Sequence, residues 1–270
     1  MPELPEMETY RKLLNEKIIG KTVTDIEVNR EKSINVSSLE FVQEIKGKQI
    51  IKIDRRAKHL IFRLNSGKNL LLHLMLGGWM YIGSEHDNPD RTKQVILSFG
   101  DMKLYFIGLR LGYLHLVDDQ DLRQRLSDLG PEPLDPTFTF NDFQNILQAK
   151  RGKLKMILVN QKIISGIGNC YSDEICFEAK IKPAVTVDSL DDDSMLSVYN
   201  SIHSVLQNAV SHGGYMDNPL LSGDQHTGGY NNHLLVYDRE GEKCKRCGGT
   251  VIKTELNSRK CFYCPDCQQD

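Results

Sequence analysis

The spacing of hydrophobic residues changes character twice along this chain of 270 residues. Between residues 2 and 19, apolar side chains recur at helical spacing and Gly20 follows them, so we predict one helix that ends there. From about Thr22 to Val117 the pattern becomes short apolar or alternating runs between turn residues, which predicts antiparallel strands packed as a sandwich or barrel. The clearest runs cover residues 50–53, 59–64, 69–76, 95–99 and 103–106.

The second half of the chain has the pattern of a mostly helical domain. A polar stretch with three prolines near its end covers residues 118–136 and favours an interdomain linker. Helical spacing then dominates residues 140–214, with Thr139 or Asn141 as the first cap and a long helix predicted over 191–211. Residues 215–233 are rich in Gly, Asn, Asp and His and predict a mobile loop. We therefore expect an α+β protein with a β-sandwich domain over 1–118, a linker over 119–136, a helical domain with the mobile loop over 137–233, and a Cys-bearing module over 234–270.

Composition and charge narrow the class of protein. The chain is 40% hydrophobic and 26% charged, as in soluble globular proteins, and it lacks a run of about 20 apolar residues or a signal segment. We expect a cytoplasmic protein. The net charge of −2 gives no global sign of a nucleic-acid partner, but basic residues concentrate in three segments. Any one segment alone is more commonly solvated surface, whereas three together can form one positive face. The segments are 46–63, 150–162 and 239–260.

Four cysteines near the C-terminus have the spacing of a structural metal site. Cys244 and Cys247 form one CxxC pair, and Cys264 and Cys267 form a second pair after sixteen intervening residues. Four thiolates complete the closed tetrahedral shell of structural zinc. Two disulfides or four unrelated thiols are the alternatives, and without a signal peptide disulfides are disfavoured. We predict one structural Zn²⁺ held by these four residues, with a β-hairpin over 251–263 between the pairs.

The N-terminal sequence Met1-Pro2-Glu3-Leu4-Pro5-Glu6 offers unusual chemistry. If Met1 is removed, the ring nitrogen of Pro2 becomes a free secondary amine. An α-amino group titrates near 8, well below the roughly 10.4 of a lysine side chain, so this amine could form a Schiff base with an electrophilic carbon. The alternative is that Pro2 and Glu3 only start a helix, because proline and acidic residues suit a first helical turn.

A glycine-bearing segment in the second half suggests a phosphate site. Residues 161–174 predict a helix, a turn that contains Gly166 and Gly168, and a second helix opened by Asn169. Such a turn exposes backbone N–H groups at a helix N-terminus, where phosphate binds readily. Lys155 lies shortly before this turn and could add positive charge. The pattern alone is weak, because Gly-x-Gly is common in turns.

Taken in order, these motifs resemble the formamidopyrimidine-DNA glycosylase and endonuclease VIII family, and the resemblance covers essentially the whole chain. It implies a bifunctional DNA glycosylase and AP lyase of base excision repair, which acts on damaged double-stranded DNA, with single strands or bubbles as alternative substrates. It also implies a monomer that contains a helix-two-turn-helix (H2TH) domain and a zinc finger. This monomer would associate with the bacterial nucleoid while it acts on DNA. The shared motifs are the N-terminal Pro-Glu-Leu-Pro-Glu, residues 129–133, the hairpin over 166–174 and the four-Cys finger.

Functional residues follow from the resemblance position by position. Pro2 matches the nucleophile that attacks C1′ of the damaged nucleoside, and Glu3 matches the acid/base residue for ring opening and β,δ-elimination. Glu6 matches a carboxylate near the same pocket, and Lys58 matches an essential phosphate-contacting lysine. The remaining matches are expected DNA contacts: His73, Leu76, Arg110, Lys155, Asn169 and Arg259.

Several departures from the family pattern bear on the substrate. Ala57 replaces a usual glycine before Lys58, and Leu76 stands where a methionine normally fills the gap left by the flipped base. Residues 107–112 keep at most Arg110 of the usual Asp-x-Arg-Arg-Phe-Gly loop, so we expect weaker or different discrimination of the opposite base. No capping loop of the 8-oxoguanine type is evident over 215–233. These departures favour an endonuclease VIII-like or divergent substrate range.

Two rival hypotheses stay open at this point. The altered loops also fit a non-catalytic paralogue that binds damaged or structured DNA without cleaving it. A zinc ribbon on an unrelated enzyme, such as one that acts on RNA, is the second rival, and the order of the motifs disfavours it. Retention of Met1 would convert the Pro2 amine into an amide and remove the nucleophile.

Overall fold

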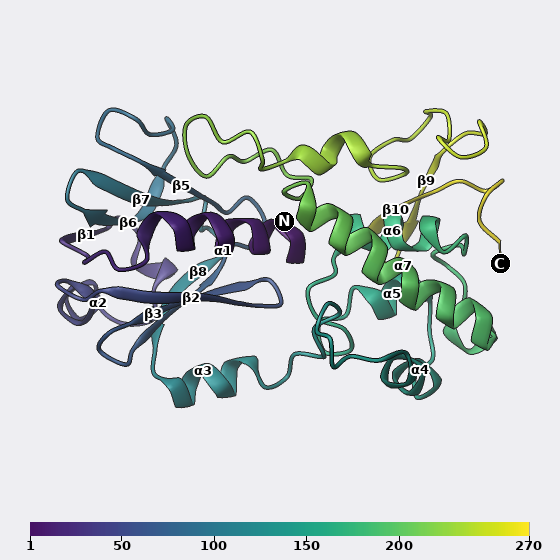
Figure 1. Ribbon diagram of the computed structural model, residues 1–270, viewed down its shortest axis with the longest axis horizontal. Coiled ribbons are helices and arrows are strands. Elements are labelled where there is room, and N and C mark those ends of the chain that lie inside the picture. Colours follow the sequence, from purple (N-terminus) through teal and green to yellow (C-terminus); the bar gives the residue numbers. More distant parts are fainter. Residues whose placement is uncertain (270) are drawn as a thin grey trace. The chain divides into compact units, whose positions relative to one another are not determined.

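The computed structural model describes residues 1–269, which form two compact units. The first unit contains Met1–Asp128 together with His212–Gly229, and the second contains Leu129–Ser211 together with Tyr230–Asp270. Strands dominate the first unit and helices dominate the second (Figure 1). The α+β class predicted from the sequence is confirmed.

Two four-stranded antiparallel sheets build the first unit. Their strand orders are β1-β6-β7-β5 and β2-β3-β4-β8. Leu60 and Phe62 of one sheet share a single hydrophobic core with Leu104 and Phe106 of the other, and the rings of Phe62 and Phe106 meet edge to face at 6.2 Å. The strands are β1 (Asp25–Val28), β2 (Ile50–Arg56), β3 (His59–Leu64), β4 (Asn69–His73), β5 (Trp79–Gly83), β6 (Lys93–Phe99), β7 (Met102–Ile107) and β8 (Tyr113–Val117).

Three helices and one 3-10 turn complete the first unit. Helix α1 lies alongside the two sheets in Figure 1 and inserts Met7, Leu14 and Ile18 into their common core. Because the apolar positions of α1 follow helical spacing, the prediction of a helix over 2–19 holds with slightly narrower bounds. The helical elements are α1 (Leu4–Ile18), η1 (Glu31–Ser33), α2 (Ser38–Ile45) and α3 (Asp119–Leu126).

Helix α3 occupies part of the segment that we expected to be a linker. The Asp118 side chain caps it by accepting a hydrogen bond from the Asp121 N–H at 2.8 Å. Leu122 is buried against Ile61 and Leu71 on the outer face of the β2-β3-β4-β8 sheet. A helix with only one fully buried side chain has little periodic signal, which is why the polar composition of residues 119–126 suggested a linker.

The segment 212–229 also differs from expectation, because it packs with the first unit and not with the helical domain. Leu220 is fully buried in the core of the two sheets. The Ile82 N–H donates to the Leu220 carbonyl at 2.6 Å, and Trp79 Nε1 donates to the Pro219 carbonyl at 3.0 Å. These contacts attach the middle of the expected mobile loop to strand β5.

The second unit is built around the long helix α7, with Thr139 as the cap of α4 through a reciprocal hydrogen-bond pair with Asp142. Residues 159–168 form turns in place of the helix that we predicted to begin at Gln161, and Gly166 adopts a φ of 90° there. The helical elements are α4 (Phe140–Gln148), α5 (Leu154–Leu158), α6 (Asn169–Glu178), η2 (Val187–Ser189), α7 (Asp192–Ser211) and η3 (Gly229–His233), and the strands of the hairpin are β9 (Ile252–Leu256) and β10 (Arg259–Tyr263).

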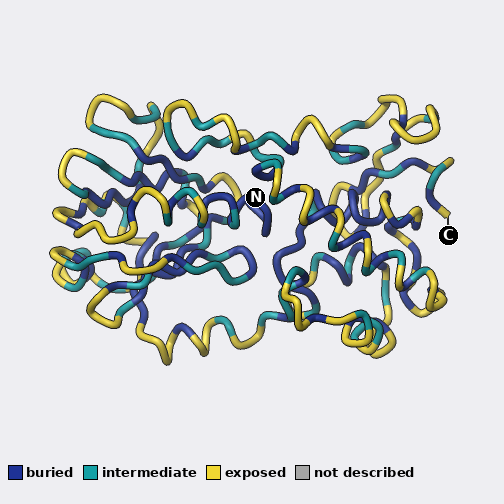
Figure 2. The backbone as a smooth tube through the Cα atoms, viewed as in Figure 1, coloured by how far each residue is buried: buried dark blue, intermediate teal, exposed yellow. Residues whose placement is uncertain are grey.

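Burial follows these elements closely. In each unit the facing sides of strands and helices are buried, and most exposed backbone lies in turns and on outer helix faces (Figure 2). Within residues 1–269, none of the helices has both the length and the apolar character required to cross a bilayer.

Candidate active site and nucleic-acid interface

The N-terminal residues are buried and held by the first turn of α1. Glu3 is the N-cap residue, and the Glu6 carboxylate accepts a hydrogen bond from the Glu3 N–H at 2.8 Å in a capping box. Pro5 occupies the first helical turn, and Pro2 precedes the cap. The helix start is therefore accounted for by Glu3, Pro5 and Glu6, and Pro2 is not needed for it.

Glu6 joins the N-terminus to a second segment of the same unit. Its Oε1 accepts a hydrogen bond from the Tyr215 N–H at 2.8 Å, while its Oε2 binds the Glu3 N–H. Gly214 lies against this carboxylate with a φ of 75°, and a Cβ at this position would collide with Glu6 Oε1. Burial, followed by the negative charges of Glu6 and Asp224, raises the pKa of the nearby Tyr10 hydroxyl. This contact was not predicted from the sequence, where the Gly213-Gly214 pair is its one local signal.

Replacing Gly214 with alanine should displace Glu6 and, given the predicted catalytic role of Glu3, reduce turnover. The added methyl group would collide with the carboxylate that holds Glu3, so we expect a loss of about tenfold or more in kcat in addition to about 1 kcal/mol of left-handed backbone strain. Gly223→Ala is the matched control, because Gly223 has a φ of 76° in the same segment and open space around its Cβ position. Steady-state kinetics and chemical unfolding of both variants check this, and equal losses in the two would contradict it.

Lys58 lies in the two-residue turn that joins β2 to β3. Ala57 adopts a φ of 52° there, a left-handed conformation that glycine adopts more readily than alanine. Arg55 donates to the Ala57 carbonyl at 3.1 Å and forms an ion pair with Glu8 at 3.0 Å. Burial raises the pKa of Glu8, but its contacts with Arg11 and Arg55 outweigh burial and lower that pKa overall. These contacts hold the turn on the side that precedes Lys58.

Two short loops beside this turn carry exposed leucines. Leu76, between β4 and β5, is 63% exposed, and Leu111, between β7 and β8, is 62% exposed, so two of the six exposed large apolar side chains within residues 1–269 lie on these neighbouring loops. The loops touch through their backbones, because a Cβ on Gly108 would collide with the Gly77 carbonyl oxygen. Leu109 is fully buried and donates its N–H to Gln94 Oε1 at 3.0 Å. The two leucines therefore project from a closely packed base.

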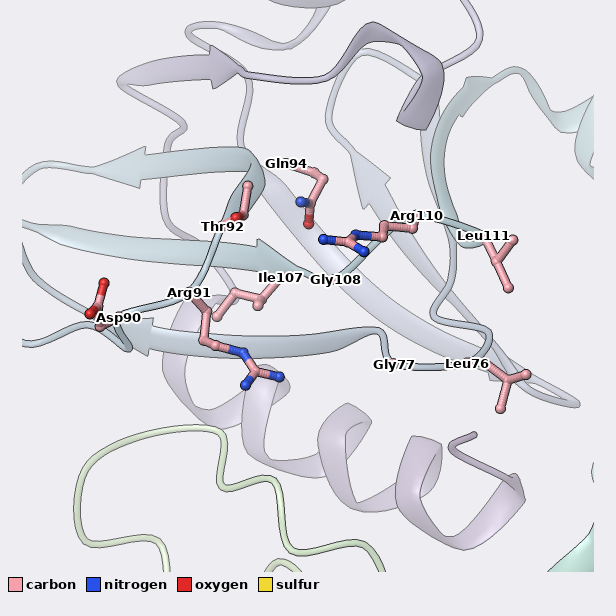
Figure 3. A pocket seen from close by; sticks show the side chains of 10 residues that line it. All are labelled: Leu76, Gly77, Asp90, Arg91, Thr92, Gln94, Ile107, Gly108, Arg110 and Leu111. Atoms are coloured by element: carbon pink, nitrogen blue, oxygen red, sulfur yellow. The ribbon is translucent and has the colours of Figure 1, made fainter.

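A cavity of about 730 Å³ lies next to these loops. Figure 3 shows Leu76 and Leu111 at one end of the cavity, whereas the guanidinium of Arg110 extends toward Gln94. Arg110, which we expected to contact DNA, thus points away from the two apolar tips. Leu111 was not predicted from the sequence as a site residue. It is a candidate only because the structure shows its side chain exposed beside Leu76.

Asn169 begins helix α6, as predicted, and its Oδ1 is buried with no hydrogen-bond partner among residues 1–269. Lys155 is placed differently from our expectation, because its side chain is completely buried. Its Nζ donates to Asp173 Oδ1 at 2.6 Å and to the Lys260 carbonyl at 2.7 Å. A phosphate cannot reach this amine without unfolding its surroundings, so the prediction of Lys155 as a DNA contact is corrected to a structural role.

Lys155→Met should destabilise the second unit strongly. The substitution leaves the Asp173 carboxylate buried without its cation, and breaking a buried pair in this way costs about 3–5 kcal/mol. Lys153→Met is the matched control, because Lys153 is two residues away and exposed. Chemical unfolding and hydrogen exchange of the α6 amides measure the free energy of unfolding of the two variants. A loss below about 1 kcal/mol in Lys155→Met would contradict the argument from the buried ion pair.

Two consecutive acids of α6 hold distant backbone segments. Asp173 Oδ2 accepts from the Phe262 N–H at 3.0 Å. Glu174 accepts from three successive N–H groups, of which those of Val236 and Tyr237 lie at 2.9 and 2.8 Å. Burial raises the pKa of Glu174, although these three N–H groups act in the opposite direction. No role for this pair was predicted from the sequence, and its only local signal is two consecutive acids in the middle of the helix.

The four cysteines converge as predicted. Their Sγ atoms all lie within 4.8 Å of one another, and the Cys244–Cys267 and Cys247–Cys264 sulfur pairs are 3.6 Å apart. These separations are far longer than a disulfide bond of about 2 Å and fit a tetrahedral shell with Zn–S distances of about 2.3 Å. The four thiols therefore fit one structural Zn²⁺, and disulfides are excluded. Arg259 is exposed next to the Asn257-Ser258 turn of the hairpin.

Comparison with known proteins identifies the family. Three family models match in the order of the chain: the formamidopyrimidine-DNA glycosylase N-terminal domain over residues 1–113, the formamidopyrimidine-DNA glycosylase H2TH domain over 129–218, and the zinc finger found in FPG and IleRS over 241–269. The chain belongs to the formamidopyrimidine-DNA glycosylase family. The resemblance inferred from the sequence motifs, including the H2TH domain and the four-Cys finger, is confirmed.

Relatives and solved structures agree with this assignment over full length. The formamidopyrimidine-DNA glycosylase of Carboxydothermus hydrogenoformans is 34% identical over 100% of both chains, and that of Lactobacillus johnsonii is 33% identical over 99% of both. A complex of Lactococcus lactis Fpg with abasic-site DNA has a TM-score of 0.93 at 32% identity, covering 99% of this chain and 100% of that one. A second complex, of a Lactococcus lactis Fpg mutant with Fapy-dG DNA, has a TM-score of 0.92 at 33% identity over 100% of both chains.

Proposed function

We propose that this protein is a bifunctional DNA glycosylase and AP lyase that removes oxidised or ring-opened bases from damaged double-stranded DNA. The observation that carries the proposal is the buried N-terminus, where Pro2 stands outside helix α1 and Glu3 is held in a capping box by Glu6. Relatives named formamidopyrimidine-DNA glycosylase, and solved Fpg complexes with abasic-site and Fapy-dG DNA, support the same substrate class. We place its action on DNA in the bacterial cytoplasm.

The chemistry follows from a secondary amine next to a carboxylic acid. The Pro2 nitrogen forms a bond to C1′, the glycosidic bond breaks, and the base leaves with its electron pair and a proton. Glu3 protonates the sugar ring oxygen as the ring opens, which leaves an iminium between Pro2 and C1′. Loss of a C2′ proton then expels the 3′ phosphate, a second elimination expels the 5′ phosphate, and water hydrolyses the iminium to restore the amine. Glu6, held by two N–H groups, positions Glu3.

We assign the phosphate contacts to four residues at turns and at the ends of elements. Lys58 in its fixed turn, His73 at the end of β4, Asn169 at the start of α6 and Arg259 on the zinc-finger hairpin come from four separate places in the chain. Side chains of this kind position a protein on the DNA backbone without reading sequence. Lys155 is left out of this set because its amine is bonded to Asp173 and to the Lys260 carbonyl. Lys58 is also largely buried, with 4% of its surface exposed.

The two exposed leucines support an endonuclease VIII-like or divergent substrate range. Leu76 and Leu111 can fill an unstacked base step by shape, as apolar wedges do. They offer no hydrogen bond to the base opposite the lesion, Leu109 is buried, and Arg110 extends toward Gln94. We therefore propose that excision rates differ only a few-fold among the four opposite bases, since a hydrogen-bonded reading would discriminate by about 1–3 kcal/mol.

A lesion panel tests the proposal. Protein that lacks Met1 is incubated with oligonucleotides that carry an oxidised pyrimidine, a ring-opened purine, a hydantoin or an abasic site, each opposite all four bases and also in a single strand and a bubble. Borohydride should trap a covalent enzyme–DNA adduct on several of these substrates. DNA binding without any trapping would overturn the catalytic proposal and favour the non-catalytic paralogue. Strong preference for one opposite base would overturn only the proposed substrate range.

A further inference from the structure

The cavity beside the two exposed leucines is lined by two arginines that have no ion-pair partner. Arg91 and Arg110 both line it, and both are exposed to solvent. Within residues 1–269, neither guanidinium forms a hydrogen bond or an ion pair. Asp90 is the one carboxylate in the lining, and it is bonded to neither arginine. The lining therefore has two accessible cations against one acid.

Both arginines lie on loops whose backbone is held in place. The Arg91 N–H donates to the Pro89 carbonyl at 2.8 Å, and the Arg110 N–H donates to the Gly108 carbonyl at 2.7 Å. Figure 3 shows the two side chains extending from different loops, with only Arg110 directed toward Gln94. The two guanidinium groups thus lie at separate points of one hollow, which suits two phosphates of a strand better than a single small anion.

A buried amide adds a hydrogen-bond donor to the same cavity. Gln94 is 3% exposed, and its Oε1 accepts a hydrogen bond from the Leu109 N–H at 3.0 Å. Its Nε2 group has no hydrogen-bond partner among residues 1–269, and the side chain lines the cavity beside Arg110. An amide donor next to guanidinium groups matches the acceptor oxygens and the negative charge of a phosphate.

The two exposed leucines lie where the chain crosses between the two sheets. Leu76 is in the loop from β4 of one sheet to β5 of the other, and Leu111 is in the loop that returns from β7 to β8. In the proposed reaction Pro2 meets the lesion nucleotide, and the start of α1 is tied to β2 by the ion pair between Glu8 and Arg55. The lesion strand therefore passes the sheet that contains β2 and β4.

The cavity lies on the other side of these crossing loops. Gln94 and Ile107, which line it, belong to β6 and β7 of the second sheet. An apolar wedge that enters the base stack at a flipped nucleotide has one strand on each side. With the lesion strand beside β2 and β4, the complementary strand is the one that meets the cavity.

We propose that Arg91 and Arg110 bind backbone phosphates of the strand opposite the lesion. This role rests on the proposed function, adds Arg91 to the interface, and gives Arg110 a phosphate as its contact. Arginine suits such a site because its planar guanidinium donates to phosphate oxygens in a fixed fork. Phosphate contacts position a duplex without reading sequence, in agreement with the weak dependence on the opposite base proposed above.

The salt dependence of binding counts these phosphates. Zinc-loaded protein without Met1 is titrated with a tetrahydrofuran abasic analogue, in a duplex and in a single strand of the same sequence, at several salt concentrations. Each phosphate contact on a duplex adds about 0.9 to the slope of log affinity against log salt concentration. Arg91→Gln and Arg110→Gln should each lower that slope by about 0.9 and weaken duplex binding about threefold to tenfold at about 0.1 M salt. Neither variant should change binding to the single strand.

Arg123→Gln is the matched control, because it removes the same charge from an exposed position on α3 and should leave the duplex slope unchanged. Arg91→Lys restores the charge and should recover the slope, which separates charge from side-chain packing. An unchanged duplex slope in Arg91→Gln or Arg110→Gln would overturn the inference and leave the proposed function intact. Equal losses on duplex and single strand would assign the phosphates to the lesion strand and overturn it as well.

Two further readouts keep these outcomes distinct. Absence of duplex binding by the wild type would count against the proposed function and not against the two arginines alone. Thermal unfolding of each variant shows whether a loss of affinity reflects misfolding.

Discussion

Protein that retains Met1 should form no covalent adduct with abasic-site DNA. A peptide bond to Met1 delocalises the Pro2 lone pair into the amide, so the nitrogen can no longer attack C1′. The loss of a covalent nucleophile typically costs about 10⁴-fold or more in turnover, and we expect a loss of this order in both base excision and strand cleavage. Borohydride trapping on denaturing gels, with mass spectrometry of the N-terminus, measures the effect.

The matched control is the same protein made with an N-terminal extension, which a specific protease removes to leave Pro2 as the first residue. Cleavage of an N-terminal extension should restore the adduct in proportion to the fraction of free Pro2. Affinity for a tetrahydrofuran analogue should change by no more than a few-fold, because the proposed phosphate contacts lie on other elements. Equal trapping before and after cleavage would show that a different amine is the nucleophile.

Loss of the zinc site should have the second largest effect. The core around the finger is small, consisting of Phe177, Val236, Val251 and Phe262 with two of the cysteines, and so few apolar residues rarely hold a fold without a metal. Cys264→Ser should release the single Zn²⁺, unfold the hairpin that carries Arg259, and weaken DNA binding by about a hundredfold, since apparent zinc-binding free energies of about 10–16 kcal/mol contribute to folding.

Cys261→Ser provides the control for the zinc variant. Cys261 is buried in the same hairpin but lies outside the group of four converging thiols. It should keep one equivalent of zinc and near-normal DNA affinity. Metal analysis, hydrogen exchange of the hairpin amides and a DNA titration distinguish the two variants. Tight DNA binding by metal-free Cys264→Ser would remove the hairpin from the proposed interface.

Several elements could be predicted from the sequence because their signals are local. Helix α1 repeats apolar residues at helical spacing, and strands β2, β3, β4, β6 and β7 coincide with short apolar runs between turns. The two CxxC pairs fix the zinc ligands through spacing alone, which is a covalent property of the chain. The family motifs identify Pro2, Glu3 and Lys58 as candidate site residues from the sequence alone.

Other features depend on contacts between distant residues and have no local signal. Lys155 appeared to be a surface cation, yet its amine bonds Asp173 and the carbonyl of Lys260, which lies 105 residues further along the chain. Leu220 lies in a polar segment, and only its burial against the two sheets shows where that segment belongs. In both cases tertiary packing overrides the polarity of the neighbouring sequence.

The paired acids of helix α6 have one more consequence for DNA. Asp173 fastens the strand that begins at Arg259, and the same helix begins at Asn169. Asn169 and Arg259 are therefore held at a defined separation, because α6 carries the first and is hydrogen-bonded to the strand that carries the second. In the proposed interface, a strand whose phosphate spacing matches the separation of Asn169 and Arg259 can bind both residues, whereas a strand of different spacing must deform or lose one contact. Asp173, which holds the hairpin against α6, would then fix the phosphate spacing that the proposed interface accepts.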